Sequence, residues 1–441
     1  MKQLNEEIFN EFEKEYDSDE KNRLIANAIS NVGVFDASYN QNVANTHSFI
    51  FSNEVKTSEI TNQKKTGRCW LFAGLNMLRI KIEKDLNMEN FEFSQNYLYF
   101  YDNMEQANNF IEKIIETKDK PITDRNVERV FYNFIPEDGG YFEYFKGLIE
   151  KYGIVPKSVM SETFSSEASY EMFFETSRLL SKAAMDIRKA KNEEEINKIK
   201  KDALSKSYNI FVKCLGKPVK NFDFIYYDKD GKYHEDLNLN PKEFYKKYLG
   251  DYLKDKIRVT NDPRNEYNRI YVQEDANHLY EALPFEVLNI SMDDMSNLIE
   301  KTILDEKSVW FACDVGQFMD RKSGILDIDL YNFDETLVKT ENFTKAEMID
   351  SRFSLATHAM NITGFLKKND KIEKWKVENS WGDENGKNGY FSMTDDWFRK
   401  FTYEAIIDKE YLSEENLKAY KKEKIKYNIF DPLYLSMLKT K

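Results

Sequence analysis

Cysteine and histidine are scarce in this sequence of 441 residues, which contains three cysteines (Cys69, Cys214 and Cys313) and four histidines. An odd, sparse set of cysteines in a chain of this length argues against a disulfide framework and favours a reducing cytoplasm. Four histidines without a C-x-x-C motif also argue against a dedicated metal cluster. We therefore expect a cytoplasmic protein that uses no metal and no other cofactor.

Long apolar runs are also missing. No stretch approaches the roughly 18 consecutive apolar residues that a membrane-spanning helix requires. The N-terminal stretch MKQLNEEIFNEFEKEYDSDEKN is charged throughout and has no apolar core for a signal peptide. The net charge is −13, from 64 basic and 77 acidic residues. This balance argues against a general attraction to nucleic acid or anionic membranes, and leaves room only for a local basic channel.

The composition is that of a soluble globular protein, with 41% hydrophobic and 32% charged residues. The sequence is rich in aromatic residues, with 32 Phe and 27 Tyr, which indicates thick packed cores or extensive interfaces. Its length is sufficient for two or three domains and a large core.

Helical spacing of apolar residues dominates the first half of the chain. Leu71, Leu75, Leu78 and Ile82 form one apolar stripe, which predicts a buried helix over residues 70–86. Further helical patterns lie at residues 1–30, 93–116, 136–158 and 165–207. The last of these is heavily charged, and we interpret it as a solvated helix pair rather than a binding surface.

Strand patterns begin at about residue 220. Residues 222–234 predict a hairpin that turns at Asp230-Gly231. The region 305–412 is rich in strand-like runs, which we expect to form an antiparallel sheet. Helices followed by strands predict an α+β fold in which the two kinds of element are segregated.

Cys69 lies at the expected start of the 70–86 helix, directly after a turn at Gly67. A thiol is a poor nucleophile until it ionises, and a helix N-terminus or a neighbouring imidazolium lowers its pKa. A structural cysteine more often lies inside an apolar stripe, as Cys313 does. Position alone therefore favours a catalytic and a structural role about equally.

A catalytic cysteine needs a base, and His358 is the candidate. His47, His234 and His278 lie in polar, loop-like stretches and are predicted to be surface histidines. His358 begins a strand-like run, and Asn379 follows the next such run. On neighbouring strands, Asn379 would accept a proton from one ring nitrogen of His358 and direct the other nitrogen toward the thiol.

Two further side chains complete the candidate site. Trp381 would shield the hydrogen bond between His358 and Asn379 from water. Gln63 lies six residues before Cys69, so its amide and the Cys69 backbone N–H would form two donors for the oxyanion of a tetrahedral intermediate. The alternative for Gln63, a lone glutamine in a polar turn, is a surface residue.

Together these residues resemble the papain-like cysteine peptidases, in which Q-x5-C-W opens the central helix and H and N-S-W lie on a barrel lobe. The resemblance implies that Cys69 is the nucleophile, His358 the base and acid, Asn379 the orienting residue and Gln63 the oxyanion donor. His358 follows Cys69 by 289 residues. Papain-type enzymes separate the two by about 130–150 residues, so about 150 extra residues lie between the lobes.

The long insertion makes the chain similar to one subfamily, the bleomycin hydrolases or bacterial aminopeptidases C. The similarity extends over nearly the whole length, through runs such as GRCWLFAGLN, FSQNYLYFYD, NDPRNEY, THAM and VENSWG. It implies a cytosolic homohexamer whose active sites face an internal cavity and act on peptides with a free N-terminus.

The resemblance also implies that a C-terminal arm lies in the cleft, where its terminal carboxylate pairs with the α-amine of the substrate. Phe430-Asp431-Pro432 matches part of the family's W-D-P-M-G motif, but the tail is a few residues longer. Lys441 would then position the substrate unless the longer tail overfills the cleft or is trimmed. A second departure is Asn361, which replaces an expected apolar strand residue.

The predicted fold is accordingly a papain-like α+β peptidase, with a helical lobe, an antiparallel β-barrel lobe and a large insertion between them. The predicted divisions are an N-terminal helical segment (1–50), the helical lobe (51–165), the insertion (166–285), the β-rich lobe (286–412), and a C-terminal helix and arm (413–441).

The predicted function is that of a cysteine aminopeptidase. A thiolate at Cys69, paired with an imidazolium at His358, would attack the amide carbonyl after the N-terminal residue and form an acyl-enzyme. Two alternatives stay open at this point: an endopeptidase, and a non-catalytic papain-like scaffold that assembles as an oligomer.

Overall fold

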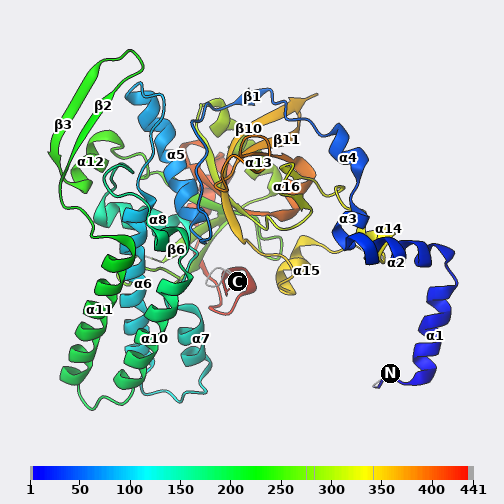
Figure 1. Ribbon diagram of the computed structural model, residues 1–441, viewed down its shortest axis with the longest axis horizontal. Coiled ribbons are helices and arrows are strands. Elements are labelled where there is room, and N and C mark those ends of the chain that lie inside the picture. Colours follow the sequence, from blue (N-terminus) through cyan, green and yellow to red (C-terminus); the bar gives the residue numbers. More distant parts are fainter. Residues whose placement is uncertain (1–2, 275, 283, 341, 436–441) are drawn as a thin grey trace.

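The computed structural model describes residues 3–274, 276–282, 284–340 and 342–435. Helices dominate residues 69–215, which we call the helical region (Figure 1). Its helices are α5 (Cys69–Asp85), α6 (Gln95–Thr117), α7 (Arg125–Asn133), α8 (Phe142–Tyr152), α9 (Phe164–Glu167), α10 (Tyr170–Ile187) and α11 (Glu193–Leu215). The helices predicted over 70–86 and 93–116 are thus confirmed. The charged helix pair predicted over 165–207 is also confirmed, as α10 and α11.

The N-terminal helices form a separate group, drawn in dark blue in Figure 1, and α1 extends away from the body of the molecule. They are α1 (Glu6–Asp17), α2 (Glu20–Val32), α3 (Val34–Ser38) and α4 (Gln41–Thr46). Asn5 and Asp19 cap α1 and α2 by accepting backbone N–H groups of the first turns. No residue of α1 or α2 is buried.

One large sheet contains most of the strands. Its members are β1 (Asn53–Glu54), β4 (Lys256–Thr260), β5 (Arg269–Gln273), β6 (Phe285–Asn289), β7 (Val309–Cys313), β8 (Met319–Asp320), β9 (Ile325–Leu326), β10 (His358–Lys368), β11 (Lys371–Glu378), β12 (Tyr390–Thr394), β13 (Thr402–Asp408) and β14 (Ile425–Lys426). The strand-rich character predicted for residues 305–412 is confirmed. β4 and β5, from within the predicted insertion, also belong to this sheet.

The order of the sheet is β14-β5-β6-β4-β13-β7-β10-β11-β12-β9-β8, and β1 pairs with β10. Its centre, β13-β7-β10-β11-β12, is antiparallel. The antiparallel sheet predicted for residues 305–412 is confirmed at this centre, but the prediction missed the parallel pairs β4 with β6, β9 with β12 and β14 with β5. These parallel partners come from distant segments, and no local pattern reports such pairing.

The other elements surround this framework. The hairpin predicted at Asp230-Gly231 is confirmed as β2 (Phe222–Tyr227) and β3 (Tyr233–Leu239), which pair antiparallel. The short helices are α12 (Pro241–Tyr248), α13 (Met292–Leu304), α14 (Phe333–Thr336), α15 (Lys345–Asp350), α16 (Asp395–Phe401), α17 (Glu414–Lys418) and α18 (Pro432–Leu435), with 3-10 turns η1 (Lys409–Tyr411) and η2 (Ala419–Lys421). None of the helices in the described ranges is long and apolar enough to cross a membrane.

Helix α5 lies between the other helices of the helical region and the sheet (Figure 1), and contacts α8 and β10. The predicted stripe Leu71, Leu75, Leu78 and Ile82 is at most 1% exposed. Gly74 permits close packing, because a Cβ there would lie 2.9 Å from the ring of Phe145. A helix buried on almost every side holds its first residue, Cys69, in a fixed position.

Candidate active site

Cys69 and His358 line the same small cavity, which has a volume of about 30 Å³. Cys69 is the first residue of α5, and His358 is the first residue of β10. The sulfur also lies close to the backbone N–H of Ala359, the next residue on β10. The fold therefore brings together two side chains that are 289 residues apart in sequence.

Asn379 orients the imidazole of His358. His358 Nε2 lies 2.9 Å from Asn379 Oδ1. Asn379 directly follows β11, the antiparallel neighbour of β10. The backbone N–H of Ser380 donates to the same oxygen at 2.8 Å, which fixes the amide. Because an amide oxygen only accepts, Nε2 carries the proton in this contact and Nδ1 is available to the thiol.

Trp381 lies against the imidazole, with its ring centroid 4.7 Å from that of His358. The guanidinium of Arg321 in turn lies 4.4 Å from the centroid of the Trp381 ring. This stack covers the contact between His358 and Asn379 with an aromatic ring. Sequence reasoning missed Arg321, since nothing in its local sequence points to the site.

Burial governs the protonation of both reactive groups. Burial lowers the pKa of His358 to about 4, against the effect of the Asn379 hydrogen bond and with a smaller contribution from the charge of Arg321. Burial also raises the pKa of the Cys69 thiol to about 11, although the N–H groups of Ala359 and Trp70 act in the opposite direction. The surroundings of each group thus favour its neutral form. A preformed thiolate–imidazolium pair, as expected from the sequence, is not favoured by these pKa shifts, because desolvation penalises each charge.

Gln63 is buried, in contrast to the surface position that a glutamine in a polar turn suggests. It is 5% exposed. Its side-chain Nε2 donates to Thr66 O at 2.6 Å, and its Oε1 accepts from Ser380 Oγ at 2.7 Å. Gln63 is thereby joined to the segment that carries Asn379 and Trp381, on the same side of the molecule as the start of α5.

A glycine pair forms another wall of the cavity that sequence reasoning did not assign to the site. Gly139, Gly140 and Tyr141 line the cavity together with Cys69 and His358. Gly139 has a φ of +111°, and a Cβ on Gly140 would lie 2.5 Å from the indole of Trp70. The diglycine in DGGYF was the available signal, because adjacent glycines mark a close approach of the backbone.

Two of the other three histidines are more buried than the sequence predicted. His47 and His278 were predicted to lie at the surface, but their side chains are only 5% and 15% exposed. His278 Nδ1 lies 2.7 Å from Asp102 Oδ1, and its ring stacks on Tyr144 with centroids 3.7 Å apart. Asp102 and Tyr144 are distant from His278 in sequence. The polar residues next to His278 therefore predicted an exposed side chain, although these distant partners bury it.

Asn361 connects the strand of the base to the helix of the nucleophile. Its Nδ2 donates to the carbonyl oxygen of Ala73 at 2.9 Å, and the residue is 1% exposed. The polar residue in an apolar strand therefore has a structural explanation: it holds β10 against the first turn of α5.

Replacing Asn361 by leucine should lower the free energy of unfolding by about 1–3 kcal/mol, because a buried hydrogen bond is lost. Urea unfolding followed by circular dichroism measures this change. Asn209→Leu, on the exposed face of α11, is the matched control and should stay within about 0.5 kcal/mol of the unchanged protein. Equal stability of the two variants would show that the contact with Ala73 contributes nothing.

Lys441, predicted to position the substrate, lies outside the described residues. The described chain ends in α18, which contacts α15.

Comparison with known proteins is consistent with this geometry. Residues 3–434 match the Peptidase C1-like family. The chain is 39% identical to aminopeptidase C of Listeria innocua over 87% of this chain and 88% of that protein. It is 36% identical to aminopeptidase W of Lactobacillus delbrueckii subsp. lactis over 98% of this chain and 99% of that protein.

A solved structure gives the same result for the fold. The crystal structure of PepW from Lactobacillus rhamnosis superposes with a TM-score of 0.94, at 36% identity, over 98% of this chain and 99% of that one. The predicted resemblance to papain-like peptidases and bacterial aminopeptidases C is thus confirmed. The chain belongs to the Peptidase C1-like family.

Proposed function

We propose that this protein removes N-terminal residues from peptides as a cysteine-type aminopeptidase. The observation that carries the proposal is the cavity shared by Cys69 and His358, with His358 held by Asn379. These are the parts that nucleophilic acyl transfer needs: a thiol, a base and a group that orients the base. Membership of a peptidase family, with curated relatives named aminopeptidases, supports the choice of reaction.

In the mechanism, the proton of the Cys69 thiol moves to Nδ1 of His358 as the sulfur attacks the carbonyl carbon of the substrate's N-terminal residue. Forming both charges together offsets the desolvation that each would suffer alone. The backbone N–H of Cys69 and the second N–H of the Gln63 amide stabilise the oxyanion. His358 then donates its proton to the leaving amine, and water hydrolyses the thioester.

The catalytic unit has two lobes in this proposal. Residues 51–165 form the helical lobe, and residues 286–412 form the β-rich lobe, whose sheet is extended by β4 and β5. Residues 166–285 are the insertion, between an N-terminal helical segment (1–50) and a C-terminal arm (413–441). The position of Cys69 on α5 and His358 on β10 supports a cleft between the two lobes.

Aminopeptidase specificity is assigned to the C-terminal arm, as in the bleomycin hydrolases that the sequence resembles. A carboxylate at Lys441 would pair with the α-ammonium of the substrate and block the cleft beyond the first residue. The described part of the arm is packed onto the molecule, because Leu433 is fully buried.

We also propose a cytoplasmic homohexamer. The apolar residues Leu4, Phe9, Phe12 and Tyr16 of the α1 segment are between 47% and 61% exposed. An amphipathic helix with its apolar face uncovered is expected to pack on a partner, and other copies of the chain would supply that partner. Light scattering of the full-length protein tests the assembly.

The pH dependence of Cys69 alkylation tests the proposed site. The rate of labelling by iodoacetamide, and kcat/KM for an aminoacyl fluorogenic amide, should rise as the pH increases through about 4. Below that pH, His358 is protonated and cannot accept the proton of the thiol; above it, the neutral base is available. Mass spectrometry identifies Cys69 as the labelled residue.

The control is Cys214, which is half-buried and lies outside the cavity. Its labelling rate should not rise as the pH increases through about 4, because Cys214 does not share the cavity of His358. If Cys69 shows that same profile, the thiol has no base beside it, and the protein is a non-catalytic scaffold. Circular dichroism at each pH excludes unfolding as the cause of a change.

A further inference from the structure

The C-terminal segment 425–433 joins the sheet to the helical region (Figure 1). β14 extends the sheet beside β5, and the N–H of Tyr427 donates to Val272 O at 2.9 Å. Farther along, the ring of Phe430 lies 3.7 Å from the guanidinium of Arg125, in α7 of the helical region. The segment therefore crosses between the two parts of the molecule that carry the catalytic residues.

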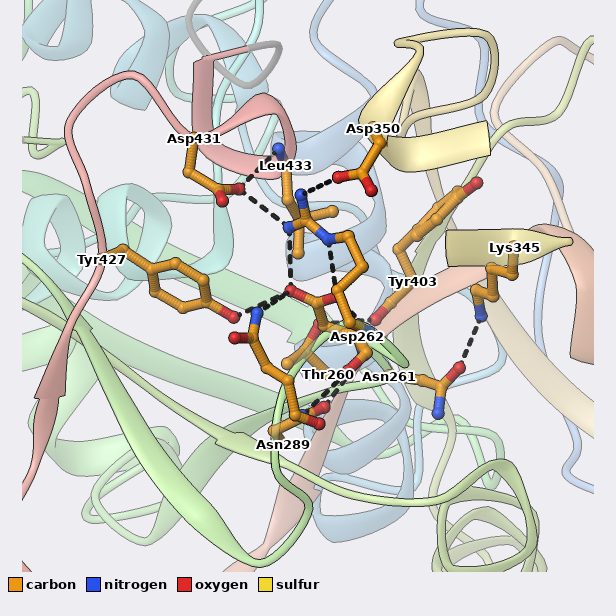
Figure 2. A network of polar contacts seen from close by, with 12 residues as sticks. Thr260, Asn261, Asp262, Asn289, Lys345, Asp350, Tyr403, Tyr427, Asp431 and Leu433 are labelled. Carbon is orange, nitrogen blue, oxygen red and sulfur yellow. Dashed lines mark hydrogen bonds and ion pairs between the residues drawn. The ribbon is translucent and has the colours of Figure 1, made fainter. Parts of the chain in front are cut away.

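Arg264 binds three carboxylates of the polar network that holds this segment, and these partners, Asp262, Asp350 and Asp431, are labelled in Figure 2. Its Nε and Nη2 donate to the two carboxylate oxygens of Asp262, each at 2.9 Å. Nη2 also donates to Asp431 Oδ1 at 2.9 Å, and Nη1 donates to Asp350 Oδ1 at 3.1 Å. One rigid, planar guanidinium thus connects three carboxylates from three separate segments.

Asp262 fixes the orientation of that guanidinium. Its side chain is fully buried. Its Oδ2 accepts from Asn265 Nδ2 at 2.7 Å and from the hydroxyl of Tyr427 at 3.1 Å, and its backbone N–H donates to Asn289 Oδ1 at 2.9 Å. With one edge of Arg264 held by Asp262, its remaining donors point toward Asp431 on the arm.

Asp431 then determines the course of the chain that follows. The same oxygen that binds Arg264 accepts the backbone N–H of Leu433 at 2.9 Å, at the start of α18. The Asp431 side chain is 18% exposed, so its ion pair is partly protected from water. An anchored Asp431 therefore sets the position at which α18 begins.

The network also reaches the segment that leads to His358. α15 is attached at both ends to the loop of Arg264, since Lys345 Nζ donates to Asn261 Oδ1 at 2.9 Å and Asp350 binds Arg264. α18 packs on α15. The chain after α15 supplies Ala356 and Thr357 to the wall of the cavity beside Cys69. The arm and this wall of the cavity are thus both held by the loop that follows β4 and carries Asn261 and Arg264.

We propose that Arg264 is a positioning residue for amino-terminal specificity, which acts by fixing the arm at Asp431 relative to the wall of the catalytic cavity. Arg264 does not contact the reacting atoms. The inference rests on the proposed aminopeptidase function. It adds the ion pair between Arg264 and Asp431, which sets the position of the arm along the catalytic cavity.

The test is Asp431→Asn in the full-length protein. Asparagine keeps the oxygen that accepts the Leu433 N–H but loses the charge that pairs with Arg264. The ratio of kcat/KM for an aminoacyl fluorogenic amide to kcat/KM for its N-acetylated form should fall about tenfold, the effect of weakening one charge-assisted hydrogen bond. Iodoacetamide should label Cys69 at an unchanged rate, because the catalytic groups are not altered.

Asp350→Asn is the matched control, since Asp350 binds the same guanidinium but is 67% exposed and lies outside the arm. It should change the ratio by less than about twofold. Trypsin cleavage at Lys424 and Lys426 gives a second readout, and should accelerate in Asp431→Asn only. If Asp431→Asn does not fold, Arg264→Lys is the alternative variant. It keeps a positive charge beside Asp262 but loses the several N–H donors of the planar guanidinium, and it should lower the same ratio.

The outcomes separate the two proposals. A wild-type enzyme that does not prefer the free amine would overturn the aminopeptidase function and the positioning role with it. A wild-type enzyme that does prefer it, together with an unchanged ratio in Asp431→Asn or in Arg264→Lys, would overturn the role of Arg264 alone.

Discussion

Replacing Cys69 by alanine should reduce the hydrolysis of aminoacyl amides by at least about 10⁴-fold, as the loss of a catalytic nucleophile does in other acyl-transfer enzymes. No other described cysteine can take over the reaction. Cys313 is fully buried within β7, and its burial raises the pKa of its thiol well above the usual value. The measurement is kcat/KM for a fluorogenic aminoacyl amide.

The fold should survive this substitution, because Cys69 fills a position at the edge of a small cavity rather than the centre of the core. Equal circular dichroism spectra and equal elution volumes would show this. Cys214→Ala is the control, and should retain full activity. Full activity in the Cys69→Ala protein would refute the assignment of the nucleophile, and with it the proposed mechanism.

Acetylating the α-amine of the substrate should lower kcat/KM by about 10²-fold or more. In the proposed function the α-ammonium pairs with a carboxylate of the arm inside the cleft, and removing one partner of a buried ion pair costs about 3–5 kcal/mol. That loss corresponds to a factor of about 10² to about 4 × 10³. A matched pair of fluorogenic amides that differ only by the acetyl group measures it.

A truncated protein provides the control for the arm. Deleting residues 436–441 removes the carboxylate of Lys441 and should raise the rate for the acetylated substrate relative to the free amine. Equal rates for both substrates in the full-length protein would instead identify an endopeptidase. Equal discrimination before and after truncation would assign the specificity to residues outside the tail.

Local sequence was sufficient for the elements that carry the site. The spacing of Leu71, Leu75, Leu78 and Ile82 predicted α5 within one residue of its observed bounds. The strand-like runs around His358 and Asn379 predicted neighbouring strands, and β10 and β11 are antiparallel neighbours. Such predictions succeed because the periodicity of a helix or a strand depends only on residues that are close in sequence.

Contacts between distant segments were beyond such reasoning. Asn361 looked anomalous in a strand until Ala73, 288 residues away in sequence, was found to accept its hydrogen bond. His278 was assigned to the surface because its partner Asp102 lies 176 residues away. Arg264 lies in the NDPRNEY run that carried the family resemblance, but its role could not be predicted locally, since each carboxylate it binds beyond Asp262 comes from another region.

Protonation was also decided by packing. The start of a helix suggested a lowered pKa for Cys69, whereas burial raises it to about 11. Near a helix terminus the dipole contributes at most about 2 kcal/mol, and desolvation of a fully enclosed charge can exceed that amount.

By itself, the sequence determined the family, the long helices of the helical region, the β2–β3 hairpin and the strands β7, β10, β11, β12 and β13. It also determined the identities of the candidate nucleophile, base and orienting residue. These follow from residue types and short spacings that the chain fixes before it folds. Only the tertiary structure decided the mixed order of the sheet, the neutral state of the two reactive groups, and the place of Arg264 between the arm and the catalytic wall. The reason is that burial and ion pairing depend on which distant segments exclude water from one another, and that is settled when the chain packs.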